Sequence, residues 1–177
     1  MEFSEVIRER YSCKKYDGRP VADEQLQAIL EAGRLAPTAK NLQGQHVYVV
    51  RSEEGLAKID ELTPCRYGAP TVLVVAFDKT NVFIYPGEGR DSGIEDATIV
   101  ATHMLLAAKN AGVESCWLNF FDPDKAKSVL GLALWNAGST SKTASSPAAP
   151  CTAIFSRWAI SPIWKNNLKA CPARRKR

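Results

Sequence analysis

The segment from Ile94 to Ala111 constrains the fold more than any other part of this 177-residue chain. Apolar residues recur along it at helical spacing, and further ones widen the stripe until the helix is apolar on nearly every side (Ile94, Ala97, Val100, Ala101, Met104, Leu105, Ala107 and Ala108). Such a helix needs other elements packed around it, so we expect it to be central rather than peripheral. Gly112 follows as its natural stop.

Elements that could cover this helix lie on both sides of it in the sequence. Helices are expected at about 3–7, 23–35, 53–62 and 123–131, where Ser52 caps the third and Asp122 with Pro123 begins the last. Apolar and β-branched runs predict strands at 47–50, 71–76 and 115–120. The uninterrupted run 71–76 is typical of a strand buried on both faces. These patterns predict one α+β domain over residues 1–131.

The charge of the chain changes abruptly near Leu132. Residues 1–124 contain all 19 acidic residues and 13 Lys and Arg, whereas residues 125–177 contain 10 Lys and Arg and no acidic residue. Average usage would place about six acidic residues in a stretch of that length. Residues 133–150 are also rich in Ala, Ser, Thr and Pro. We therefore expect an irregular, basic tail after about residue 132.

The five cysteines bear on the cellular compartment. They form an odd set without C-x-x-C spacing, which favours reduced thiols over a disulfide framework or a zinc site. No apolar run approaches the roughly 18 residues of a membrane span, and the acidic start Met1–Glu5 does not resemble a signal peptide. We expect a cytoplasmic protein with no membrane partner.

Familiar catalytic motifs based on side chains are missing. The sequence has no G-x-S-x-G, Walker, H-E-x-x-H or G-x-G-x-x-G motif, and His46 and His103 are interpreted as structural. Asp91, Glu95 and Asp96 lie at the start of the central helix, where carboxylates complement the helix dipole. We therefore predict no catalytic side chain and no metal, and expect that a cofactor would carry the chemistry of an enzyme of this kind.

Two segments have the composition of a ligand site. Arg10, Ser12 and Lys14 occupy alternate positions after the first helix, so in an extended chain two cations and a hydroxyl could face a phosphate or a ring edge. The alternative is that these basic residues only complement the dipole at the helix end.

The second segment is the polar loop 36–45. Asn41, Gln43 and Gln45 offer amide donors and acceptors that suit a heterocycle with alternating N–H and C=O groups, such as the pyrimidine edge of a flavin. The alternative interpretation is an ordinary connecting loop.

Four blocks of the sequence, in this order and spacing, resemble the FMN-dependent nitroreductase family. Residues 10–17 read RYSCKKYD, where the family typically has Arg-Arg-Ser-x-Arg-x-Phe, and residues 32–43 read AGRLAPTAKNLQ, similar to its Ala-Pro-Ser block with following Asn and Gln. The other two blocks are CRYGAPT at 65–71 and DATIVATHMLLAA at 96–108, which continues into GVESCWL at 112–118. The resemblance covers residues 1–132.

The resemblance implies a mixed β-sheet flanked by helices, in a homodimer that binds FMN between its subunits. One subunit would contact FMN through Arg10, Tyr11, Ser12 and Lys14, where Lys14 stands at a position that is commonly arginine. The other subunit would contribute its loop, and the strand after the central helix would run beside the isoalloxazine (Pro37, Thr38, Ala39, Asn41 and Gln43; Trp117, Leu118 and Asn119).

The implied activity is that of an oxidoreductase that uses NAD(P)H and FMN to reduce nitroaromatic or quinone-like acceptors, with no catalytic side chain. The alternative function is a flavin-binding or nucleic-acid-binding module without turnover. The basic tail favours nucleic acid at first sight, but it lacks interleaved aromatic residues and residues 1–124 are net acidic, so we expect no nucleic-acid partner.

The resemblance ends at the tail. The family continues with a Pro-Glu-rich turn, an apolar strand and an arm that bears a basic cofactor contact, whereas this chain continues from Ala133 with ALWNAGS. We therefore divide the chain into an FMN-binding domain at 1–132 and an atypical basic tail at 133–177. Our hypothesis is that a shifted reading frame or a replaced C-terminus produced this tail.

Overall fold

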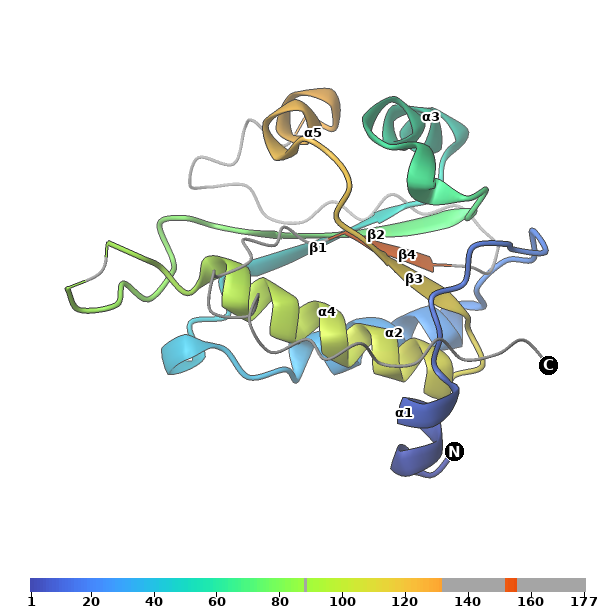
Figure 1. Ribbon diagram of the computed structural model, residues 1–177, viewed down its shortest axis with the longest axis horizontal. Coiled ribbons are helices and arrows are strands. Elements are labelled where there is room, and N and C mark those ends of the chain that lie inside the picture. The colour runs from blue at the N-terminus through green and yellow to red at the C-terminus, as the bar shows by residue number, and fades with distance from the viewer. Residues whose placement is uncertain (88, 132–151, 156–177) are drawn as a thin grey trace, which may run out of the picture.

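A mixed four-stranded sheet lies at the centre of the computed structural model, which describes residues 1–87, 89–131 and 152–155 (Figure 1). The strands are β1 (Gln45–Val50), β2 (Thr71–Phe77), β3 (Ser115–Leu118) and β4 (Thr152–Phe155), in the order β1-β2-β4-β3. Strand β1 is antiparallel to β2, while β4 runs parallel to both β2 and β3. The expected mixed sheet with flanking helices is confirmed.

Helices cover both faces of this sheet. α2 (Asp23–Arg34) and α4 (Gly93–Asn110) lie on one face, and α3 (Glu53–Leu62) and α5 (Pro123–Val129) lie on the other (Figure 1). α1 (Phe3–Glu9) lies near the C-terminal end of α4, where the amino group of Met1 donates to Asn110 Oδ1 over 3.2 Å. Two short 3₁₀ turns, η1 (Ala39–Asn41) and η2 (Pro64–Arg66), complete the described elements.

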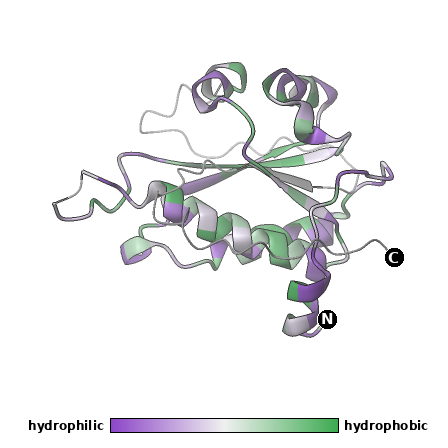
Figure 2. Ribbon diagram, in the orientation of Figure 1, coloured by the Kyte–Doolittle hydropathy of each residue, from purple (hydrophilic) through white to green (hydrophobic). Residues whose placement is uncertain are grey.

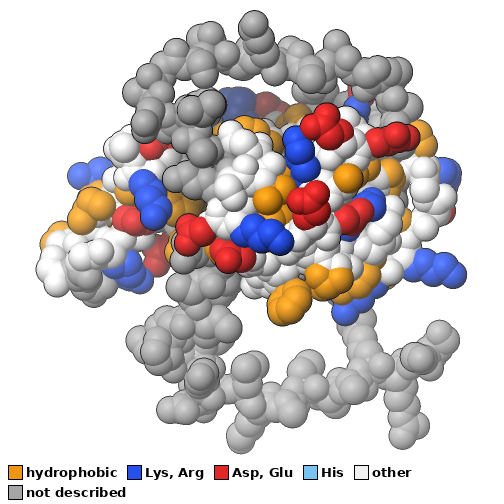
Figure 3. Space-filling model, turned by 90° about the horizontal axis from the view of Figure 1, so that it is seen from above, with side chains coloured by type: hydrophobic (Ala, Val, Ile, Leu, Met, Phe, Trp, Pro, Cys, Tyr) orange, Lys and Arg blue, Asp and Glu red, His pale blue; other side chains and the backbone are white. Residues whose placement is uncertain are grey.

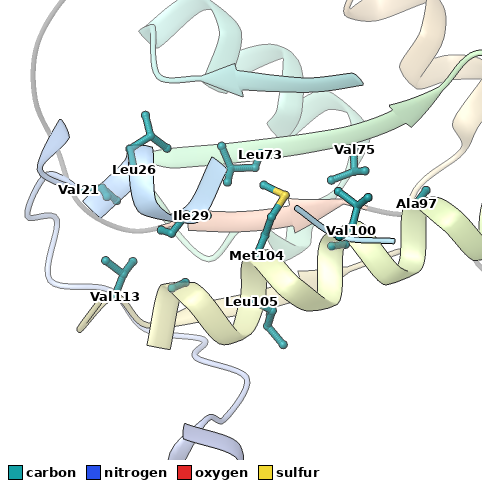
Figure 4. Close-up of a cluster of buried hydrophobic side chains, with 13 residues drawn as sticks. Val21, Leu26, Ile29, Leu73, Val75, Ala97, Val100, Met104, Leu105 and Val113 are labelled. Carbon is teal, nitrogen blue, oxygen red and sulfur yellow. The ribbon is translucent and has the colours of Figure 1, made fainter. Parts of the chain in front are cut away.

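Strand β2 separates two hydrophobic layers. Leu73 and Val75 point to the layer shared with α2 and α4, whereas Val72 and Val74 belong to the layer on the side of α3 and α5 (Figure 4). All four side chains are buried, as the continuous apolar run predicts. Alternation along one strand therefore fills both sides of the sheet.

Helix α4 is the longest described helix and is hydrophobic over most of its length (Figure 2). Its inner face is buried, including Met104 at 0% exposure, but its outer face is not. Ile99, Thr102 and His103 are exposed there. The expected central position of α4 therefore holds for one face only, and His103, which we interpreted as structural, is exposed on the other face.

The predicted helix caps are present. Ser52 Oγ accepts a hydrogen bond from Gly55 N at 3.2 Å, and Asp122 Oδ1 accepts from Asp124 N at 2.9 Å. Gly112 has a φ of 75° after the end of α4. Local side-chain chemistry therefore sets these boundaries as the sequence predicts.

The prediction of an irregular tail is wrong at Thr152–Phe155, which form β4 between β2 and β3. Its four residues lack a clear alternating pattern, and long-range backbone pairing on both sides makes the strand. The rest of the predicted tail, residues 133–151 and 156–177, lies outside the described residues. Among the residues that are described, no helix combines the length and apolarity of a membrane span.

Candidate functional site

The first predicted segment runs alongside the edge strand β3. Arg10 ends α1 with an extended backbone, and Ser12 forms a parallel bridge with Ser115. The N–H of Cys13 donates to the carbonyl of Ser115 over 3.0 Å. Cys13 is buried, while Ser12 and Lys14 on either side of it are exposed. Side chains therefore alternate between exposed and buried over Ser12, Cys13 and Lys14, as we predicted for an extended segment.

The side chains of Ser12 and Lys14 lie beside the thiol of Cys116. Burial raises the pKa of the Cys116 thiol, while the Lys14 ammonium and a hydrogen bond with Ser12 act in the opposite direction. The Lys14 Nζ also lies 5.7 Å from the centre of the Tyr67 ring. Lys14 and Ser12 therefore share one surface, with half-buried Arg10 at its start and exposed Tyr11 between.

The second predicted segment is a tightly turned loop around η1. Lys40, Asn41 and Gln43 all have φ between 51° and 53°, which is uncommon outside glycine. The N–H of Gln43 donates to Thr38 Oγ1 over 3.0 Å, which closes the loop on itself. Pro37, Asn41 and Gln43 are exposed, so their side chains are available to a ligand.

Asp96 anchors this loop to the first turn of α4. The residue is 3% exposed, and its Oδ1 accepts from the backbone N–H of Ala39 at 2.8 Å while Oδ2 accepts from the Ser92 hydroxyl at 2.7 Å. The sequence interpretation of Asp96 as a complement to the helix dipole missed this contact. Ser92 four residues earlier is a local signal for one bond, but nothing local indicates a partner 57 residues away.

The connection between β2 and α4 supports the same loop. Asn81 Nδ2 donates to the carbonyl of Leu42 at 3.1 Å, and the N–H of Asp78 donates to the carbonyl of Gly44 at 2.9 Å. Lys40 Nζ lies 4.7 Å from the centre of the Phe83 ring. Three separate contacts therefore hold the loop in its left-handed conformation.

The three predicted residues of β3 and its end differ in exposure. Leu118 is 4% exposed in the layer toward α3 and α5, whereas Trp117 is half-buried against the opposite layer. The indole Nε1 of Trp117 is buried with no hydrogen-bond partner among the described residues. Asn119, directly after the strand, is exposed. Of the three, only Asn119 offers a freely accessible side chain.

The two predicted segments lie at opposite ends of α4. The loop is attached at Asp96, whereas Ser12 pairs with Ser115, just beyond the other end of the helix. At a rise of about 1.5 Å per residue, Asp96 and Asn110 are roughly 21 Å apart along the axis. We call the surface of Arg10, Ser12 and Lys14 the first half-site and the loop 37–43 the second half-site.

A hollow of ≈ 420 Å³ adjoins the second half-site. Thr38 and Gln43 line it together with residues of α2, β1 and α4. In the described part of the chain, no group of three or more His, Cys, Asp or Glu side chains could hold a metal ion. The donors at both half-sites are cations, hydroxyls and amides, which suit an anionic or heterocyclic ligand.

Comparison of the sequence with known proteins identifies a family that it matches. The model of the nitroreductase family matches residues 7–66 and 64–138. A relative from Archaeoglobus fulgidus, named "Putative NADH dehydrogenase/NAD(P)H nitroreductase", is 31% identical over 133 residues, which are 73% of this chain and 74% of the relative.

Solved structures agree with the sequence relatives. A nitroreductase family protein from Clostridium difficile 630 superposes with a TM-score of 0.71 at 35% identity, covering 74% of this chain and 76% of the other. An FMN-dependent nitroreductase from Clostridium difficile R20291 gives a TM-score of 0.62 at 27% identity, covering 73% and 78%. Sequence and fold therefore agree: the chain belongs to the nitroreductase family.

Proposed function

We propose that the chain is an FMN-dependent oxidoreductase that uses NAD(P)H to reduce nitroaromatic or quinone-like acceptors. Membership of the nitroreductase family and the relative that is named an FMN-dependent nitroreductase support this proposal. The observation that carries it is the pair of half-sites, one cationic and one rich in amides, at the two ends of α4. When bound, FMN supplies the two-electron chemistry that links donor and acceptor.

The first half-site fits the anionic end or a ring oxygen of FMN. Ser12 and Lys14 are exposed on one side of the segment, and the guanidinium of Arg10 can form paired charge-assisted hydrogen bonds. Lys14 adds charge without the bidentate geometry of arginine. Tyr11 is exposed between Arg10 and Ser12, and we assign it to the same contact surface.

The second half-site fits the edge of the flavin ring. Asn41 and Gln43 present neutral amides on a rigid loop, and Pro37, Thr38 and Ala39 shape the backbone beside them. Neutral donors and acceptors can orient a heterocycle without adding charge to it. We assign Trp117, Leu118 and Asn119 to the wall beside the ring, where Asn119 would act through its side chain and buried Leu118 through its backbone.

We further propose that a homodimer completes the site. In a twofold dimer whose α4 helices pack antiparallel, the N-terminal end of one helix meets the C-terminal end of its partner. This arrangement would bring the second half-site of one protomer to the first half-site of the other, twice per dimer. The outer face of α4, with exposed Ile99 and half-buried Leu106, would then lie near the twofold axis.

The surface of α1 supports the same interface. Phe3 is 67% exposed and Ile7 is 52% exposed, and Met1, Phe3 and Leu106 line a shallow hollow between α1 and α4. Clustered apolar side chains of this kind mark interaction surfaces. Burying them against a second copy would remove them from water.

Substitution of Arg10 tests the cofactor assignment. Loss of a charge-assisted pair typically costs about 1.5–3 kcal/mol, so Arg10→Ala should weaken FMN binding roughly 10- to 150-fold in a flavin-quenching titration of the apoprotein. Lys14→Ala should cost less, because an ammonium has no bidentate option. Arg8→Ala, which removes an exposed arginine of α1 outside the half-site, is the matched control.

Thermal melts of the apo forms separate binding from folding. The apo form of Arg10→Ala should melt close to the wild type, because the substitution leaves no buried partner unpaired in the described part of the chain. Unchanged FMN affinity, or an unfolded apo form, would contradict the assignment of Arg10 to the cofactor.

A binding module without turnover is the second candidate. The basic composition of residues 125–177 favours nucleic acid as its ligand. Against this, Lys and Arg side chains lie among Asp and Glu on the face shown in Figure 3 rather than gathering into one cationic patch. Yellow purified protein with NAD(P)H-dependent flavin reduction would favour the enzyme, and tight, salt-sensitive DNA binding would favour the module.

We also propose a cytoplasmic location for the enzyme. Cys13, Cys65 and Cys116 are free thiols in the described part of the chain, which suits a reducing compartment where NAD(P)H is supplied.

A further inference from the structure

A strained turn precedes β2 beside the first half-site. The N–H of Ala69 donates to the carbonyl of Arg66 over 3.0 Å, and both residues between them are left-handed, Tyr67 with φ 54° and Gly68 with φ 74°. This is the geometry of a type I′ turn, in which Gly, Asn and Asp are the usual central residues. A tyrosine at the first central position is therefore unusual and costs backbone strain.

The turn is held from two sides. The Arg66 guanidinium forms a bidentate ion pair with Asp60 of α3, at 2.6 and 2.5 Å, and its third nitrogen donates to the carbonyl of Ala69 at 2.8 Å. A hydrogen bond between the Tyr67 hydroxyl and the Cys65 thiol raises the pKa of Tyr67. The tyrosine ring is therefore fixed both at its backbone and at its hydroxyl end.

Lys14 approaches this fixed ring from another part of the chain. Pairing of Ser12 and Cys13 with Ser115 sets the backbone of the segment that carries Lys14, and its Nζ lies 5.7 Å from the ring centre of Tyr67. A lysine ammonium within about 6 Å of an aromatic face is attracted by the ring quadrupole. Lysine has a flexible four-carbon stem, so a fixed ring beneath it limits where the charge can lie.

We infer that Tyr67 is a positioning residue that holds the Lys14 ammonium at the first half-site for an anionic or electron-rich part of the bound flavin. This inference rests on the proposed function. It also gives a reason for the strained turn, because sparsely populated backbone conformations persist where the side chain that they present is needed. Glycine at this position would relieve the strain but would remove the aromatic ring beneath the Lys14 ammonium.

A double-mutant cycle tests whether Tyr67 acts through Lys14. The variants are Tyr67→Leu, Lys14→Met and the double variant, each titrated with FMN as apoprotein. We expect Tyr67→Leu to weaken FMN binding about 2- to 5-fold when Lys14 is present, and to have no further effect in the Lys14→Met background. Tyr67→Phe keeps the ring but loses the hydroxyl contact with Cys65, so it should bind FMN more tightly than Tyr67→Leu and close to the wild type.

Other outcomes overturn the inference. An equal loss in both backgrounds would mean that Tyr67 acts independently of Lys14, and unchanged affinity in Tyr67→Leu would mean that it has no role in binding. If Tyr67→Leu fails to fold, Tyr67→Asn takes its place in the cycle, since asparagine accepts the left-handed backbone.

The Arg10→Ala titration separates this inference from the proposed function. Loss of FMN binding in Arg10→Ala, together with no effect of Tyr67 substitution, would reject the positioning role alone. FMN affinity that is unchanged in Arg10→Ala and in Lys14→Met would reject the proposed site as well.

Discussion

Asp96 brings a carboxylate into the interior at the start of α4, and its two oxygens have different partners. One accepts from the backbone of Ala39 in the second half-site, and the other accepts from the Ser92 hydroxyl in the turn before the helix. Both donors are neutral, and the N-terminal end of α4 adds the favourable dipole. The charge is thus stabilised by hydrogen bonds that also fix the loop.

Removing this carboxylate should loosen the loop. Asp96→Ala leaves the Ala39 N–H unpaired, so we expect a stability loss of about 1–3 kcal/mol in thermal melts and weaker FMN binding. Asp96→Asn keeps one acceptor and should recover part of the stability and part of the FMN affinity. Ser92→Ala is the comparison variant, because it removes the Ser92 partner of Asp96, and with it the acceptor of the Phe83 N–H, but leaves the Ala39 bond in place. Equal FMN affinities in Asp96→Ala and Ser92→Ala would contradict the anchoring role.

Gly44 is required by close contact rather than by backbone conformation. A Cβ at this position would lie 2.3 Å from the backbone oxygen of Asn81, which cannot move without shifting the β2–α4 connection. We therefore expect Gly44→Ala to destabilise the fold by about 1–3 kcal/mol, as overpacking does elsewhere. A denaturant melt measures this loss, and a variant as stable as the wild type would show that the contact relaxes freely.

Elements with local signals are the ones that the sequence predicts well. α3 and α5 begin at Ser52 and Asp122 as their caps require, and β2 has its continuous apolar run. β4 was missed because its pairing partners, not its own residues, make it a strand. At the site, the order of motifs pointed to both half-sites, but the contacts of Asp96 and Tyr67 join distant segments and left no local pattern.

β4 is an inner strand of the sheet, since in the order β1-β2-β4-β3 it is the strand that pairs with both β2 and β3. Ala153 pairs with Val72 on one side and with Cys116 on the other. Proline there removes a backbone donor from an inner strand, where proline is essentially not found. We expect Ala153→Pro to lower the melting temperature sharply, whereas Ala153→Ser, which keeps the N–H, should have a small effect. Equal melting temperatures would argue against this strand order.

The origin of the tail can be tested at the level of the gene. We propose that residues 133–177 come from a shifted reading frame or a replaced C-terminus, because acidic residues stop after Asp124 and the family match ends at residue 138. Translating the coding DNA in the other two frames should then recover the Pro-Glu-rich turn and apolar strand of the family. If neither of the other two frames encodes this turn and strand, the frameshift is ruled out.

The distance between the two half-sites of one chain favours a dimer. In the proposed site the two half-sites of one chain lie about one α4 length apart, so we expect that a monomer cannot close both around one flavin. The surface that would meet a second copy carries exposed apolar side chains, Phe3 and Ile7 on α1 and Ile99 on α4. If the proposed dimer is obligate, its interface should bury more than about 2,000 Å². Cofactor binding and association should therefore rise and fall together.

A charge on the outer face of α4 should prevent dimer formation and FMN binding together. Ile99 is 36% exposed in the single chain, and in the proposed dimer Ile99→Glu would bury two unpaired carboxylates in the interface. We expect light scattering to show a monomer and the flavin titration to show greatly weakened FMN binding, while the isolated chain stays folded because Ile99 lies outside its core. Ala57→Glu, which adds the same charge on exposed α3 across the sheet, should remain a flavin-loaded dimer. A monomer of the wild type or of Ile99→Glu that binds FMN tightly would mean that one chain forms the whole site, and the assignment of the two half-sites to different subunits would then be wrong.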